Sequence, residues 1–100
     1  MKLRIENSKA KNKRFVAIFT DKNNKEKRVN FGLKNPKIGT YIDHQDKDIR
    51  RRYRARHEPP EKKFYGNFQK PATLSRFILW GEAQNLQDAI KDYKKKFNLS

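Results

Sequence analysis

The sequence predicts a single small basic α+β domain over residues 1–100, with an N-terminal antiparallel β-hairpin or three-stranded sheet packed by about three C-terminal helices. Apolar residues alternate with polar ones in the first third of the chain, which is typical of half-buried strands. In the last third they follow a 3.6-residue period, which is typical of helices. Only 34% of residues are hydrophobic, but 12% are aromatic, and large rings can fill a small core.

Residues 1–33 form the β-rich segment. Leu3 and Ile5 alternate with charged residues, which indicates a first strand. Residues 15–20 are β-branched and aromatic and predict the most buried strand. A turn-rich segment and a third alternating run that ends at Gly32 complete the expected hairpin.

Residues 40–58 are expected to form an arginine-rich helix. Thr40 and Asp43 have the spacing of a capping box, with aspartate in place of the usual glutamate. Ile49 and Tyr53 lie four residues apart and mark the buried stripe. No glycine or proline interrupts the segment from residue 44 to residue 57, so the helix should be continuous there.

The charged side chains of this helix have the spacing of helical ion pairs. Asp46 with Arg50, and Asp48 with Arg52, are separated by four residues in the favourable order. Arg50 and Arg54 should share one exposed face, because residues four apart lie above one another on a helix.

Prolines indicate two connections. Lys34–Gly39 contains Pro36 and is expected to be a loop. Residues 59–71 begin at Pro59 and should form a connector that its aromatic rings hold onto the core, namely Phe64, Tyr65 and Phe68.

Residues 72–98 are expected to contain two further helices. Pro71 suits the first turn of one helix, and Gly81 suits the position just after its end. Asn85 suits the N-cap of the other. Their apolar residues follow a helical period, including Leu74, Phe77, Ile78, Leu86, Ala89, Ile90, Tyr93 and Phe97.

The composition narrows the possible functions. The chain has no cysteine, no apolar run long enough to span a membrane and no apolar signal segment at its start, so we expect a soluble protein inside a cell or a particle. The net charge is +15, and residues 1–57 carry 18 lysines and arginines against 6 acids. Such a surface attracts nucleic acid, anionic lipid or acidic protein.

Enzymatic chemistry has little support. His44, Asp48 and His57 are the plausible metal ligands, but a continuous helix would separate the two histidines by roughly 20 Å. No serine has a nucleophile-elbow context, and the glycines form no phosphate-binding loop. We therefore expect no catalytic residue, metal site, cofactor or small-molecule substrate. A metal-dependent nuclease is a remote alternative.

Two basic clusters are the candidate sites for an anionic partner. The arginine cluster suits bidentate phosphate contacts and comprises Arg50, Arg51, Arg52, Arg54 and Arg56. The second lies near the N-terminus and comprises Lys9, Lys11, Lys13 and Arg14. Asparagine and glutamine are absent from the arginine-rich part, so DNA binding through it should be sequence-neutral. Arginine and aromatic residues also suit a protein interface, as in a cement protein between larger subunits.

Several ordered motifs support a family resemblance. These are Phe31-Gly32, Tyr41-Ile42-Asp43-His44, Asp46, Tyr53, Arg56-His57, the segment from Leu74 to Trp80, Ile90, Tyr93-Lys94 and Phe97-Asn98-Leu99. From Arg14 onward they resemble a family of small basic proteins of nucleocytoplasmic large DNA viruses, such as chlorella viruses and mimivirus relatives. No site residue is transferred from that family.

The resemblance implies a virion component, assembled in the cytoplasm or nucleus of the host cell. We expect a non-enzymatic minor capsid protein whose basic surfaces bind acidic capsid subunits or an anionic membrane surface. The alternative is a sequence-neutral DNA-binding protein packaged with the viral genome.

Overall fold

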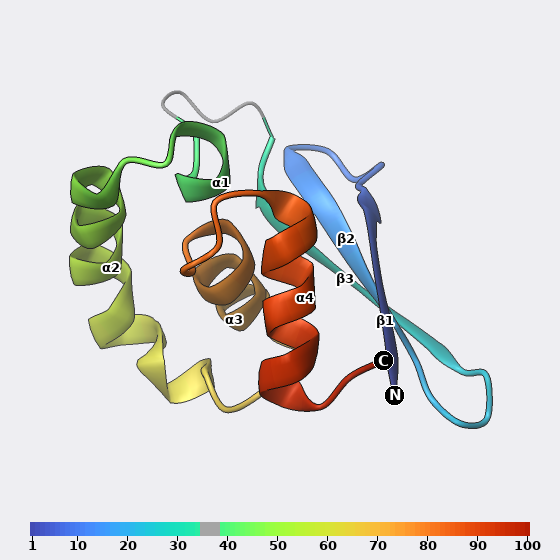
Figure 1. Ribbon diagram of the computed structural model, residues 1–100. Helices are drawn as coiled ribbons and strands as arrows, with labels where there is room; N and C mark the ends of the chain where they lie inside the picture. The colour runs from blue at the N-terminus through green and yellow to red at the C-terminus, as the bar shows by residue number, and fades with distance from the viewer. Residues whose placement is uncertain (35–38) are drawn as a thin grey trace.

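The computed structural model describes residues 1–34 and 39–100 and has an α+β fold, in which a three-stranded antiparallel sheet is followed by helices (Figure 1). The three-stranded form of the prediction is therefore confirmed. The elements are β1 (Lys2–Asn7), β2 (Lys13–Thr20), β3 (Glu26–Leu33), α1 (Tyr41–His44), α2 (Lys47–Glu61), the 3₁₀ turn η1 (Lys62–Phe64), α3 (Pro71–Leu74), the π-helical turn η2 (Ser75–Leu79) and α4 (Leu86–Phe97).

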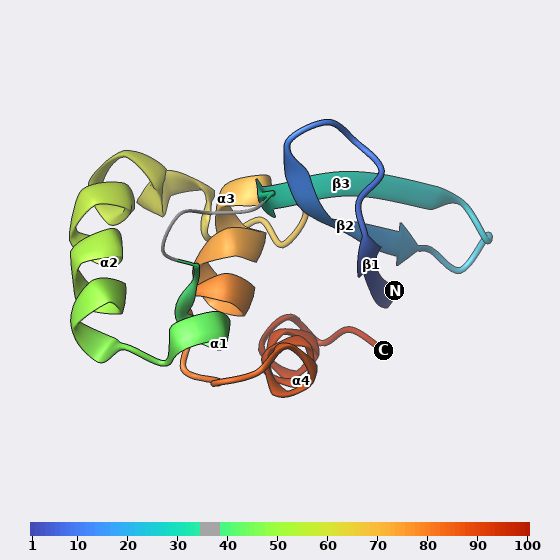
Figure 2. The same cartoon turned by 90° about the horizontal axis from the view of Figure 1, so that it is seen from above.

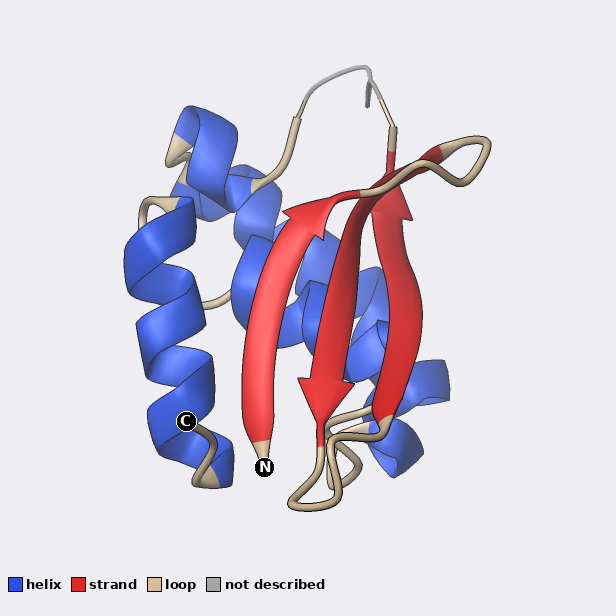
Figure 3. Ribbon diagram, turned by 90° about the vertical axis from the view of Figure 1, so that its right-hand side faces the viewer, coloured by secondary structure: helices blue, strands red, loops and turns tan. Residues whose placement is uncertain are grey.

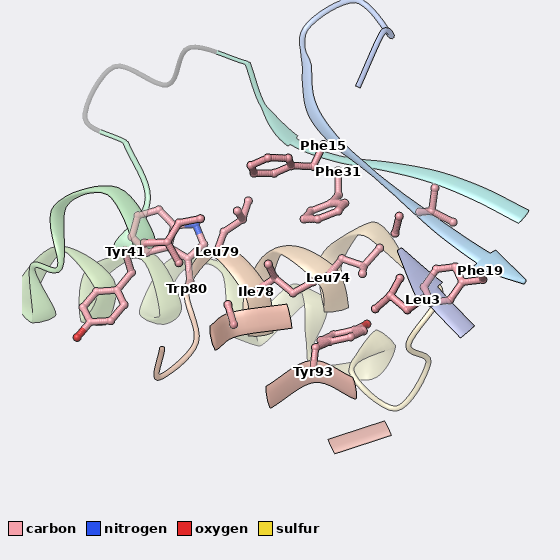
Figure 4. Close-up of a cluster of buried hydrophobic side chains, with 14 residues drawn as sticks. Leu3, Phe15, Phe19, Phe31, Tyr41, Leu74, Ile78, Leu79, Trp80 and Tyr93 are labelled. Carbon is pink, nitrogen blue, oxygen red and sulfur yellow. The ribbon is translucent and has the colours of Figure 1, made fainter. Parts of the chain in front are cut away.

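The sheet has the order β1-β2-β3, and the helices cover one of its two faces (Figure 3). Phe15, Ala17 and Phe19 of β2 belong to the core on the covered face. Figure 4 shows how rings and aliphatic side chains from the sheet, η2 and α4 converge there. Residues 15–20 are the most buried strand segment, as predicted, because β2 is the central strand.

The helix predicted as continuous is divided into α1 and α2. Gln45 has a left-handed backbone conformation, with φ of 53°, and ends α1. The Asp46 carboxylate then accepts hydrogen bonds from the backbone N–H groups of Asp48 and Ile49 at 2.9 and 3.1 Å. Asp46 therefore caps a new helix instead of continuing the first, a role that aspartate favours over a helix interior. The expectation of one unbroken helix was wrong.

Helix α2 also extends further than predicted, through Pro59 and Pro60 to Glu61. Because proline has no N–H, the carbonyls four residues before Pro59 and Pro60 lose their helical donors. The Lys62 N–H still bonds the Glu58 carbonyl. The connector therefore begins at η1 and not at residue 59.

Two of the three connector rings hold the connector on the core, as predicted. The Phe68 ring lies 5.5 Å from the Phe19 ring, and the Tyr65 ring lies 5.5 Å from the Phe77 ring. Phe64 is exposed, which corrects the prediction for that ring. Residues 35–38 of the predicted loop lie outside the described residues.

The next helix begins at Pro71 and ends at Leu79, and its second half widens into η2. The Trp80 N–H bonds the Ser75 carbonyl at 3.1 Å, which is a five-residue spacing. Gly81 follows this helix, as predicted. Glycine is needed there because there is no space for a side chain: a Cβ atom would lie 2.4 Å from the Phe77 carbonyl oxygen. Asn85 caps α4 as predicted, because its side chain accepts from the Asp88 N–H at 2.9 Å.

The two ends of the chain meet at the edge of β1. The Leu3 N–H bonds the Ser100 carbonyl, and the Ser100 N–H bonds the Met1 carbonyl, each at 2.9 Å. The C-terminal residue thus extends the hydrogen bonding of the sheet beyond β1. Among the described residues, none of the helices has the length and apolar character needed to cross a bilayer.

Candidate anion-binding surface

The predicted arginine cluster divides into two groups that do different things. Arg50 and Arg54 were expected on an exposed face, but their side chains are only 14% and 20% exposed. They face the turn formed by residues 80–82, and they attach α2 to it. The face of α2 that contains Ile49 and Tyr53 packs on the core, and these arginines border that face.

Arg54 makes the most contacts at this turn. Its Nε and Nη2 donate to the Trp80 carbonyl at 3.2 and 2.9 Å, and its Nη2 also lies 3.1 Å from the Glu82 carboxylate. Burial lowers the pKa of Arg54, while the hydrogen bond from Arg54 lowers the pKa of Glu82. Arg50 donates to the Gly81 carbonyl at 3.0 Å and places its guanidinium 4.4 Å from the centre of the Tyr41 ring.

Arg54→Gln is expected to lower the free energy of unfolding by about 2 kcal/mol, because the Trp80 carbonyl then loses its charged donor. Arg52→Gln removes the same charge from an exposed position and should change stability by less than about 0.5 kcal/mol. Urea denaturation of both variants measures the difference. Equal losses would show that the contact with Trp80 does not hold α2.

The other arginines of α2 remain on the surface. Arg51 is 79% exposed and lies 3.2 Å from Asp48, so the predicted pair of Asp48 with Arg52 is replaced by a pair one residue closer. Arg52 and Arg56 are also exposed. The predicted Asp46–Arg50 pair does not form, because Asp46 is used as a cap and Arg50 faces Gly81.

The N-terminal cluster divides in the same way. Arg14 forms a bidentate pair with Asp43, with both contacts at 2.7 Å, and so ties β2 to α1. The Arg14 guanidinium holds the pKa of Asp43 far below its usual range, and hydrogen bonds from Thr40 contribute. Lys9, Lys11 and Lys13 are exposed. An open groove of about 530 Å³ lies beside Lys13, lined by Asn7, Ser8, Arg14, Lys34, Gly39 and Asp43.

Lysine and arginine differ consistently across this surface. Every ion pair within residues 1–34 and 39–100 uses an arginine or His57, and none uses a lysine. Arginine suits such pairs because its planar fork matches a carboxylate, whereas lysine is a flexible point charge. The lysines therefore supply most of the uncompensated positive charge.

The two histidines lie at the ends of a stack of rings. His44 lies 5.7 Å from Trp80, Trp80 stacks on Tyr53 at 4.1 Å, and Tyr53 stacks on His57 at 4.0 Å. The His57 Nδ1 lies 3.2 Å from the Glu61 carboxylate. The described part of the chain contains no group of three histidine, cysteine or acidic side chains that could hold a metal ion. The rings join α1, α2 and η2.

Two arginines on the open face of the sheet were not among the predicted site residues. Arg4 of β1 and Arg28 of β3 are more than half exposed. Their signal was present in the sequence, because each alternates with apolar core residues and must therefore face away from the core.

Comparison with known proteins gives one match. The model of a family of unknown function, DUF5754, matches residues 3–57. No curated protein and no solved structure matches the chain. The family match includes the N-terminal strand, which the viral resemblance does not cover, and excludes the two C-terminal helices. Since it spans the sheet, α1 and most of α2, which is more than half of the chain, the protein belongs to the DUF5754 family.

Proposed function

We propose that the protein is a non-enzymatic structural component of a large DNA virus particle, a minor capsid protein whose basic surfaces bind acidic neighbouring subunits or the inner membrane surface. The viral assignment rests on the sequence resemblance. The observation that supports a structural role is the distribution of those lysines and arginines that have no carboxylate partner.

This charge points in several directions. Lys9 and Lys11 lie in the loop between β1 and β2, Arg52 and Arg56 lie on α2, and further exposed lysines lie on α4, including Lys91 and Lys95. Helix α2 and the sheet lie at opposite ends of the molecule, and α4 lies along another side (Figures 1 and 2). A protein wedged among several acidic surfaces needs cations on several sides, because exposed charges act only over about 10 Å.

The test is the location of the protein in purified particles. Particles of the virus that encodes the chain are disrupted, the shell is separated from the DNA, and the protein is followed by immunoblot. We expect it to stay with the shell. Recovery only with the DNA, followed by release in moderate salt, would overturn the capsid proposal.

DNA binding is the second candidate, and the lysines between β1 and β2 favour it. Ser8 of this loop hydrogen-bonds Asn30 of β3 at 2.5 Å, so the loop is held beside the sheet. A held group of cations can contact phosphates on one strand of a duplex. If about six cations meet phosphates, the logarithm of affinity should fall with the logarithm of salt concentration with a slope near −5.

A further inference from the structure

The open face of the sheet carries an ordered row of side chains. Arg4 of β1 and Arg28 of β3 lie on either side of Ile18 in the strand register. Ile18 is completely buried although the helices lie on the other face, so neighbouring side chains on the open face must cover it (Figure 3). The two arginines are therefore packed at their stems and exposed at their charged ends.

Each guanidinium also has a carboxylate beside it. Arg4 Nε donates to Glu6 at 2.6 Å, and Arg28 Nη2 lies 3.6 Å from Glu26. Each carboxylate is two residues from its arginine and so lies on the same face. Because Glu6 takes the Nε of Arg4, both terminal nitrogens of Arg4 remain for a bidentate contact with another group.

Lysines lie at both ends of this face. Lys9 and Lys11 lie in the loop at one end of the strands, and Lys22 and Lys25 lie in the hairpin loop at the other. The eight residues of β2 separate these loops by about 26 Å, at about 3.3 Å per residue. The face thus has oriented arginines and carboxylates at its centre, and unpaired cations at its ends.

This pattern is complementary to the major groove of duplex DNA. Guanine presents O6 and N7 there to a bidentate arginine, and a carboxylate can accept from the cytosine amino group. Two strand spacings place Arg4 and Arg28 about 10 Å apart, which is within a groove about 12 Å wide. An anionic lipid surface would favour a uniformly positive face, and the central carboxylates do not suit it.

We propose that the open sheet face binds duplex DNA in the major groove, with Arg4 and Arg28 contacting guanines and the two lysine loops contacting phosphates. This proposal rests on the DNA-binding candidate above and keeps its lysine contacts. The sheet face takes the place of the α2 contacts that the sequence predicted. It also adds a preference for G·C pairs, which DNA binding through α2 would lack.

The first experiment compares two variants with the same loss of charge. The Arg4→Gln/Arg28→Gln variant and the Arg51→Gln/Arg52→Gln variant are titrated against a labelled G·C-rich duplex by fluorescence anisotropy. The sheet variant should bind about tenfold or more weakly, as expected for a lost bidentate arginine–guanine contact, and the α2 variant should stay within about twofold of the wild type. Thermal unfolding checks that both variants fold.

The second experiment changes the DNA. Replacing guanine by 7-deazaguanine removes N7 from the major groove, whereas replacing it by inosine removes only the minor-groove amino group. The first change should weaken wild-type binding about tenfold and leave the sheet variant unaffected, while the second should change neither protein's affinity. Equal binding to all three duplexes would overturn base contact by the arginines.

The remaining outcomes separate the two proposals. Loss of binding only in the Arg51→Gln/Arg52→Gln variant would overturn the sheet proposal while leaving DNA binding intact. If the wild type binds no duplex, both the sheet proposal and the DNA-binding candidate fail. Binding to phosphatidylserine vesicles but to no duplex would instead assign the basic surface to lipid.

Discussion

Gly81→Ala is expected to lower the free energy of unfolding by about 3 kcal/mol, because the new methyl group has no space. Its Cβ would lie 2.4 Å from the Phe77 carbonyl oxygen and 3.1 Å from the carbonyl carbon. Both are backbone atoms of η2, so no side chain can rotate to relieve the clash. The turn at residues 80–82 must move instead, and that turn carries the carbonyls that receive Arg50 and Arg54.

The loss should therefore exceed that of Arg54→Gln, which removes one of the two arginine attachments. Trp80 is the only tryptophan, and its ring stacks on Tyr53 of α2, so its fluorescence reports whether α2 remains attached. We expect a change in this emission in native buffer together with a lower urea midpoint.

Gly66→Ala is the matched control for Gly81→Ala. A Cβ at Gly66 would have no heavy atom within 4 Å, and its backbone is not in the left-handed region. The free energy of unfolding should be unchanged or slightly higher. Alanine lowers the conformational entropy of the unfolded chain, which can stabilise the folded protein by about 0.4–1 kcal/mol. Similar destabilisation by both substitutions would show that the space around Gly81 is not the cause.

The sheet could be predicted because its alternation of apolar and charged residues is local. Leu3 and Ile5, and likewise Val29 and Phe31, show which side of each strand meets the core, and one helix-covered face is enough to satisfy that pattern. The N-cap of α4 was predictable for the same reason, since Asn85 and Asp88 interact within one turn.

The arginines were predicted less well because their roles depend on distant partners. The sequence spacing of Arg50 and Arg54 shows that they share a face, but not that the carbonyls of Trp80 and Gly81 lie opposite it. Arg14 likewise meets Asp43, 29 residues away. Apolar periodicity reveals core positions, whereas an arginine that donates to a backbone carbonyl leaves no periodic signal.

The break between α1 and α2 illustrates a competition between local preferences. Asp46 has the spacing of an ion pair with Arg50 and also suits an N-cap, and the cap forms. A cap is worth about 1 kcal/mol, whereas an exposed ion pair on a helix is worth about 0.3–0.5 kcal/mol. The break turns His44 toward Trp80, so that His44 joins the ring stack that ends at His57.

Trp80→Ala should lower the free energy of unfolding by about 4 kcal/mol, because it removes a large buried ring at the junction of three elements. Trp80 is 7% exposed and lies between Tyr53 of α2 and His44 of α1. No neighbouring ring can fill the space without leaving its own contacts. Circular dichroism during urea denaturation measures the loss without needing the tryptophan signal.

Two further variants test whether the loss in Trp80→Ala comes from the ring stack. Trp80→Phe keeps an aromatic ring and should recover more than half of the loss. Phe64→Ala removes a ring that is 37% exposed, and it should cost less than about 1 kcal/mol. If Trp80→Ala costs no more than Phe64→Ala, α1 and α2 are held without the ring stack, and the contacts of Arg50 and Arg54 must suffice.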